Sequence, residues 1–135
     1  MIYLDTNFFA KAVLEGGNAK KVLLEIALGK ESAATSLITW DEFLWVLKRH
    51  LKNYVLAKSE AEKLLILPNI VFYDLTFEII KKAQEIVKIY PEAKPRDAIH
   101  VASALYNNIN TIITDDVDFD QFKGIKRIAI NQFHI

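Results

Sequence analysis

The chain has 135 residues, and its 17 Lys and Arg balance its 17 Asp and Glu. This balance excludes a polybasic nucleic-acid coat and an acidic disordered tail, and the length predicts a single domain, 1–135. With 52% hydrophobic residues, four Gly, three Pro and no Cys, we expect dense secondary structure in a reducing compartment such as the cytoplasm. A mean hydropathy of +0.14 also favours a homodimer, because an interface between two copies would cover apolar surface.

The N-terminal half of the chain alternates strand and helix patterns. Two Ser/Thr-x-x-Glu capping boxes, at 39–42 and 59–62, predict where two of the helices begin. In chain order we expect a strand at 2–4, helices at 8–14 and 19–28, a short strand at 33–35, a helix at about 40–52 and a shorter helix that begins near 59 and ends at Pro68.

The C-terminal half continues this alternation. Its predicted elements are a strand at 70–73, a helix at about 77–90, a helix that begins at Pro95 and ends at 107–108, a strand at 111–113, an acidic loop at 115–120 and a last strand at 127–130. Five short apolar strands separated mostly by helices are typical of an α/β fold. We therefore predict a three-layer sandwich with a largely parallel five-stranded sheet.

Four acidic residues fall where strands end or helices begin: Asp5, Glu42, Asp97 and Asp116. Because the carboxyl ends of parallel strands meet at one edge of a sheet, we expect these side chains to converge there. At a spacing of about 6 Å, each pair would repel by about 3 kcal/mol at an effective dielectric of 20, so the cluster needs cations. A site of oxygen ligands without Cys selects Mg²⁺ or Mn²⁺, and the matching chemistry is phosphodiester hydrolysis.

Each of these residues also has a purely structural explanation. Glu42 and Asp97, in the first turns of their helices, would stabilise those helices by interacting with the helix dipole. Asp5 would cap the helix that follows it. Arg49 is either a contact to the phosphates of a substrate or part of a solvated helix end. His100 is either a contact to substrate or to Asp97, or a partly buried packing residue.

Four segments, in this order, resemble the PIN-domain nucleases. They are Leu-Asp-Thr-Asn at 4–7, Thr-Trp-Asp-Glu at 39–42, Arg-Asp-Ala-Ile-His-Val-Ala-Ser-Ala-Leu at 96–105, and Thr-Asp-Asp at 114–116 with Phe119. The VapC-type toxins of toxin-antitoxin pairs are the subgroup that the chain resembles most. The resemblance implies a metal-dependent endoribonuclease, usually dimeric, whose site is filled or blocked by an antitoxin protein.

The resemblance also implies a role for each matching residue. Asp5, Asp97 and Asp116 would bind Mg²⁺ or Mn²⁺, and Glu42 would hold a water ligand or act as the base. Asp115 and Asp118 are alternatives to Asp116, since both lie close to it in the sequence. The polar supports would be Thr6, Asn7 and Thr114, and the candidate substrate contacts are Arg49, Arg96 and His100.

Two other functions stay open. Asp74 ends the third predicted strand, as the phosphate acceptor of a receiver domain would, and Thr114 ends the fourth, as its switch hydroxyl would. Asn131 stands where such a domain needs a Lys, however, and Asp74 is better explained as the cap of the next helix. The second alternative is a binding module that keeps the PIN fold without catalysis.

Overall fold

The structure is a computed structural model that describes all residues, Met1–Ile135. Its centre is one sheet with the strand order β3-β2-β1-β4-β5, and every neighbouring pair of strands is parallel. The predicted α/β fold with a parallel five-stranded sheet is thereby confirmed. The strands are β1 (Ile2–Leu4), β2 (Ala33–Ser36), β3 (Ile70–Tyr73), β4 (Thr111–Ile113) and β5 (Lys126–Ile128).

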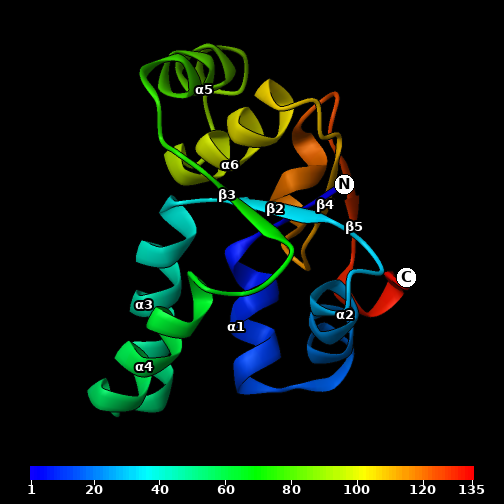
Figure 1. Cartoon of the computed structure of the whole chain (residues 1–135). Helices are drawn as coiled ribbons and strands as arrows, with labels where there is room; N and C mark the ends of the chain where they lie inside the picture. The colour runs from blue at the N-terminus through cyan, green and yellow to red at the C-terminus, as the bar shows by residue number, and fades with distance from the viewer.

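Helices cover both faces of the sheet, which makes three layers (Figure 1). Side chains alternate between the two faces of a strand, so Ile2 and Leu4 pack under α1 to α4 while Tyr3 packs under α5 and α6. No helix of the fold combines the length and the apolar character that crossing a membrane requires. The helices are α1 (Thr6–Leu14), α2 (Gly17–Ala27), α3 (Ile38–Leu51), α4 (Tyr54–Leu64), α5 (Phe77–Ile89), α6 (Pro95–Tyr106) and the short 3-10 helices η1 (Val117–Gln121) and η2 (Ile130–Gln132).

The chain order reverses around β1, the central strand. From β1 the chain adds β2 and β3 on one side, and then returns to add β4 and β5 on the other. A parallel sheet opens a crevice where its strand order reverses, outside the carboxyl ends of the strands. Here the crevice lies between the residues that follow β1 and those that follow β4, beginning with Asp5 and Thr114.

The predicted capping box at 39–42 is wrong. Helix α3 already begins at Ile38, which places Thr39 inside the helix. The Thr39 hydroxyl lies 2.7 Å from the Thr35 hydroxyl, and Thr35 donates a hydrogen bond to the carbonyl oxygen of Leu4 at 2.8 Å. Thr39 therefore ties α3 to two strands, and it cannot be the N-cap of α3 because it lies inside the helix.

Other predicted boundaries also move. Helix α4 begins at Tyr54, five residues before the second predicted capping box, because the Asn53 side chain accepts a hydrogen bond from the Leu56 amide at 3.1 Å. Thr76, and not Asp74, caps α5 by accepting a hydrogen bond from the Ile79 amide at 3.2 Å. The last strand is shorter than predicted and ends at Ile128.

These caps make a direct prediction about stability. Asn53→Ala removes the acceptor for an orphan amide of α4 and is expected to lower the free energy of unfolding by about 1 kcal/mol. Ser59→Ala, the matched change inside α4, is expected to have an effect of less than about 0.5 kcal/mol. Urea unfolding of the two variants measures both values. Equal losses, or a larger loss for Ser59→Ala, would contradict the assigned helix start.

Candidate active site

A cavity of about 600 Å³ opens at the carboxyl edge of the sheet. All four predicted acids, Asp5, Glu42, Asp97 and Asp116, line it, although they come from four separate parts of the chain. The remaining lining residues are Thr6, Asn7, Ala10, Val46, Lys94, Pro95 and Arg96. The topology thus collects the acids in one place, as the strand order predicts.

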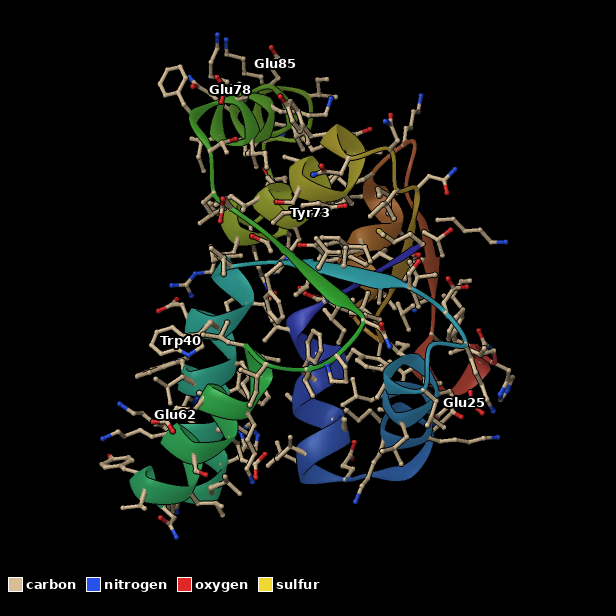
Figure 2. The ribbon with its side chains drawn as sticks, in the orientation of Figure 1. Glu25, Trp40, Glu62, Tyr73, Glu78 and Glu85 are labelled. Carbon is tan, nitrogen blue, oxygen red and sulfur yellow. The ribbon has the colours of Figure 1, made fainter.

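Other acidic residues of the chain behave differently. Figure 2 shows Glu25 on α2, Glu62 on α4, and Glu78 and Glu85 on α5, all on the outer sides of their helices. Glu62, Glu78 and Glu85 are exposed, as solvated residues of amphipathic helices usually are. The acids of the cavity are exceptions to this arrangement, because two of them, Asp5 and Asp97, are buried.

Asp5 occupies the N-cap position of α1 but makes no capping hydrogen bond with its side chain. Its Oδ2 atom instead accepts a hydrogen bond from the Thr114 hydroxyl at 2.9 Å, across the boundary between β1 and β4. Burial raises the pKa of Asp5, and His100 and Thr114 offset only part of this rise. The simple helix-cap explanation of Asp5 is therefore wrong, and its carboxylate is held at the cavity by a buried hydroxyl.

Asp97 is the one acid with a buried side-chain oxygen that has no hydrogen-bond partner. Pro95 fixes the start of α6, which places Asp97 in its first turn. Its Oδ2 atom is buried without any hydrogen-bond partner. Burial raises the pKa of Asp97 to about 6, and the carboxylates of Asp116 and Asp5 contribute to the rise. A buried carboxylate without a donor is rare in native proteins, and it makes Asp97 a candidate ligand for a cation.

The loop after β4 carries the three candidates for the fourth acid, Asp115, Asp116 and Asp118, which the sequence could not tell apart. Oxygen atoms of Asp97, Asp116 and Asp118 lie within 4.8 Å of one another. Asp116 accepts a hydrogen bond from the Asp118 amide at 2.9 Å, which orders the loop at the rim of the cavity. Both Asp116 and Asp118 are therefore placed to share an ion with Asp97.

Asp115 points elsewhere and has partners of its own. Its Oδ2 atom accepts a hydrogen bond from Lys11 Nζ at 2.7 Å, and its Oδ1 atom accepts one from the Ile130 amide at 2.9 Å. Burial opposes ionisation of Asp115, but the hydrogen bonds from Lys11 and the Ile130 amide and the nearby positive charges together outweigh it and lower the pKa of this carboxyl. Asp115 thus joins α1 to the C-terminal segment, and it is not among the residues that line the cavity of the acids.

The two neighbouring acids are expected to respond differently to substitution. Asp115→Ala removes two hydrogen bonds and is expected to lower the free energy of unfolding by about 1 to 3 kcal/mol, with Mn²⁺ affinity unchanged within about twofold. Asp116→Asn is expected to leave stability nearly unchanged and to lower Mn²⁺ affinity by about tenfold or more. Urea unfolding and calorimetric Mn²⁺ titration of both variants measure these effects. The reverse pattern would show that Asp115 is the fourth acid.

Glu42 lies one helical turn inside α3, not in the first turn, because α3 begins earlier than predicted. Its Oε1 atom accepts hydrogen bonds from the Thr6 hydroxyl at 2.9 Å and from His100 Nε2 at 2.5 Å. Burial opposes its ionisation, but the hydrogen bonds and charge of His100, together with Thr6, lower the pKa of Glu42. Glu42 is therefore ionised at neutral pH without an added cation.

His100 is not a substrate contact, since its side chain is fully buried. It lies beneath the acids, with Nε2 also 3.5 Å from Asp5 Oδ1 and with Nδ1 2.7 Å from the Tyr3 hydroxyl. The Tyr3 contact was missed by the sequence reasoning. The one signal in the sequence is that Tyr3 lies between two aliphatic residues of a buried strand, where a tyrosine hydroxyl needs a hydrogen-bond partner.

The candidate cationic contacts separate into two groups. Arg96 lines the cavity and lies 3.5 Å from Asp41, whereas the exposed Arg49 is not among the lining residues. Lys94, which the sequence reasoning missed, also lines the cavity, with its Nζ atom 3.5 Å from Asp118. The one signal for Lys94 was its position just before Pro95, because the start of the helix that carries Asp97 also faces the site.

The donor set of this site fits a divalent cation. The side-chain donors that line the cavity are oxygen atoms of carboxylates, the Thr6 hydroxyl and the Asn7 amide, and neither a thiolate nor an imidazole is among them. Hard oxygen donors suit Mg²⁺ and Mn²⁺, and the unpartnered oxygen of Asp97 supplies a position for one.

Comparison with known protein families identifies the fold. The family model for the PIN domain matches residues 2–125. The chain belongs to the PIN domain family. Asp74, the acceptor in the receiver-domain alternative, follows the edge strand β3 and lies outside the cavity of this PIN domain. No curated protein sequence matches the chain significantly.

Solved structures resemble this PIN domain over nearly its whole length. A toxin-antitoxin complex from Klebsiella pneumoniae has 22% identity and a TM-score of 0.69, with 93% of this chain and 96% of the other covered. VapBC2 from Rickettsia felis, bound to a promoter DNA fragment, has 17% identity and a TM-score of 0.74, with 96% of this chain and 98% of the other covered. VapC20 from Mycobacterium tuberculosis, a toxin that cleaves the sarcin-ricin loop, has 19% identity and a TM-score of 0.73, with 93% of this chain and 98% of the other covered.

Proposed function

We propose that this PIN domain is a metal-dependent endoribonuclease and the toxin of a toxin-antitoxin pair. The observation that carries the proposal is the buried, unpartnered carboxylate of Asp97 beside Asp116 and Asp118, in a cavity that also contains Asp5 and Glu42. The family and the structural likeness to a toxin that cleaves the sarcin-ricin loop support it.

Asp5, Asp97 and Asp116 would hold Mg²⁺ or Mn²⁺, with Asp118 close enough to contribute an oxygen. When bound, such a cation supplies Lewis-acid chemistry: it neutralises charge on the scissile phosphate and makes water easier to deprotonate. The hydroxyl of Thr114 fixes Asp5 for this role. Asn7 accepts a hydrogen bond from the Asp115 amide at 3.2 Å and so fixes the loop that carries Asp116.

Glu42 is the candidate general base. It is ionised, it lines the cavity, and Thr6 and His100 occupy only one of its two oxygens. An ionised carboxylate within reach of a water molecule accepts a proton from it as the water attacks phosphorus. Glu42 would therefore contribute to the rate of cleavage more than to the affinity for metal.

The surroundings of the acids suit an RNA strand. Lys94 and Arg96 at the rim of the cavity would contact its phosphates. A second cavity, of about 470 Å³, shares Asn7, Ala10 and Val46 with the first and extends along α1 and α3 to His50. The two cavities together would accept nucleotides on either side of the cleaved bond.

We further propose a cognate antitoxin protein and a homodimer as partners, and the cytoplasm as the location. The Klebsiella pneumoniae and Rickettsia felis structures that this chain resembles are toxin-antitoxin assemblies. Several large apolar side chains of this chain are more than 70% exposed, and a protein interface would cover them. They are Leu28, Val55, Ile66 and Phe77.

The test is cleavage of matched RNA and DNA oligonucleotides by the purified protein in the presence of Mn²⁺. We expect internal cleavage of the RNA and none of the DNA. Binding of RNA without cleavage at any divalent metal concentration would instead support the non-catalytic module. Expression in a bacterial host separates a toxin from other nucleases: the wild type should arrest growth, and Glu42→Gln should not.

A further inference from the structure

Three side chains form a line that ends at the proposed base. Tyr3 of β1 lies with its hydroxyl 2.7 Å from His100 Nδ1, and His100 of α6 lies with Nε2 2.5 Å from Glu42 Oε1 of α3. Tyr3 and His100 are both fully buried. The line thus runs from the inside of the sheet to the floor of the cavity.

The contacts of this line are directional. A carboxylate only accepts hydrogen bonds, so His100 Nε2 is the donor to Glu42 whether the imidazole is neutral or charged. The Tyr3 hydroxyl occupies the opposite nitrogen and thereby fixes the plane of the ring. Edge-to-face packing adds to this constraint, with the His100 ring centre 5.7 Å from that of Tyr3 and 6.5 Å from that of Phe119.

The arrangement leaves Glu42 with one free oxygen. Its Oε1 atom receives two hydrogen bonds, from His100 and from Thr6, which come from different helices. Two donors on one oxygen prevent the carboxylate from rotating about its Cγ–Cδ bond. Its Oε2 atom has no hydrogen-bond partner in the protein, and Glu42 lines the cavity.

We propose that Tyr3 and His100 are positioning residues that orient Glu42 so that Oε2 accepts the proton of the attacking water. The inference rests on the proposed function. In this step the water oxygen bonds to phosphorus, its proton passes to Oε2, and the bond from phosphorus to the leaving ribose oxygen breaks. The leaving oxygen takes a proton from solvent. Tyr3 touches no reacting atom, and acts only through His100.

Tyr3→Phe tests this role, because it removes one oxygen and keeps the packing of the ring. We expect kcat for RNA cleavage to fall by about 3- to 30-fold, since small misplacements of a catalytic group have effects of this size. KM and Mn²⁺ affinity should stay within about twofold of the wild type, as neither depends on the orientation of the base. Tyr90→Phe is the matched control: it removes a phenol oxygen that binds the Lys123 amide, outside the cavity. An unchanged kcat for Tyr3→Phe, or an equal fall for Tyr90→Phe, would overturn the proposal.

Nuclear magnetic resonance of the His100 ring gives a second readout that does not depend on cleavage. The Nε2 proton should resonate far downfield in the wild type, and both Glu42→Gln and Tyr3→Phe should shift it. If the wild type cleaves no RNA, the proposed function fails, and this signal decides whether the line of contacts exists. A resonance that responds to both substitutions supports the orientation of Glu42, and one that responds to neither overturns it.

Discussion

Replacing Asp97 with Asn is expected to nearly abolish RNA cleavage and, at neutral pH without metal, to make the protein more stable. Asn keeps the shape of the side chain but removes the charge that a metal ion would neutralise. Loss of such an electrostatic contribution, several kcal/mol in the transition state, corresponds to a fall in cleavage rate of about three orders of magnitude. The gain in stability follows from the same burial that makes Asp97 suitable for metal.

The sign and pH range of the stability change follow from linkage. The pKa of Asp97 is about 6 in the folded protein and near 3.8 in the unfolded chain. Between these values the folded state holds a proton that the unfolded state has lost, so this residue lowers stability as pH rises from about 4 to about 6. Above that range the loss is complete, at about 2 to 3 kcal/mol, and Asp97→Asn should recover it.

Urea unfolding without metal at pH 7.5 and at about pH 3 measures this effect. The variant should exceed the wild type in free energy of unfolding at pH 7.5 and match it at about pH 3, below both pKa values, where Asp97 is mostly protonated in both states. Asp74→Asn is the matched control, an exposed acid outside the cavity that should change neither stability nor cleavage. A variant less stable than the wild type at pH 7.5 would show that Asp97 is compensated by contacts within the protein.

Binding of Mn²⁺ is expected to weaken steeply below pH 6. A carboxylate must lose its proton before it binds metal, and the pKa of Asp97 is about 6. Each proton that must be displaced lowers the affinity by about tenfold per pH unit below the pKa. The raised pKa of Asp5 adds to this effect at lower pH, since both acids face the same cavity. Affinity should become constant above about pH 7.

Calorimetric titration of Mn²⁺ from pH 5 to pH 8 measures this profile. Bound metal should also raise the stability of the wild type by about 2.7 kcal/mol at 100 times the dissociation constant. EDTA should reverse that gain and stop RNA cleavage. The Asp97→Asn variant supplies the control, as it should show neither the gain nor the steep part of the profile. An affinity that is constant from pH 5 to pH 7 would contradict a site built around Asp97.

Much of the fold could be predicted because its signals are local. Short apolar runs specify the strands, and Pro95 specifies the start of α6. The order of the strands was not in the sequence pattern, but the rule that parallel strands end at one edge sufficed to bring the acids together. Helix starts were predicted less well, because Thr39 uses its hydroxyl for Thr35 and Asn53 caps α4 ahead of the Ser59 pattern.

The chemistry of the site depended on contacts that no local pattern contains. His100 meets Glu42 across 58 positions and Tyr3 across 97, and Lys11 meets Asp115 across 104. The first two contacts make His100, a candidate substrate contact, a buried support of Glu42, the proposed base. The third gives Asp115 a partner outside the cavity and so favours Asp116 as the fourth acid. Sequence patterns indicated which residue types belong to the site, and the packing of α1, α3 and α6 determined what each of them contacts.

Diffraction from crystals soaked in Mn²⁺ would test the central claim most directly. Anomalous scattering locates the ion without reference to any assumed mechanism. The proposed function predicts a Mn²⁺ peak in the cavity, within bonding distance of carboxylate oxygens of Asp97 and Asp116, and no such peak in Asp97→Asn crystals. A wild-type cavity that stays empty at saturating Mn²⁺, or an ion bound only by acids outside it, would contradict the assignment of these residues to a metal-dependent nuclease.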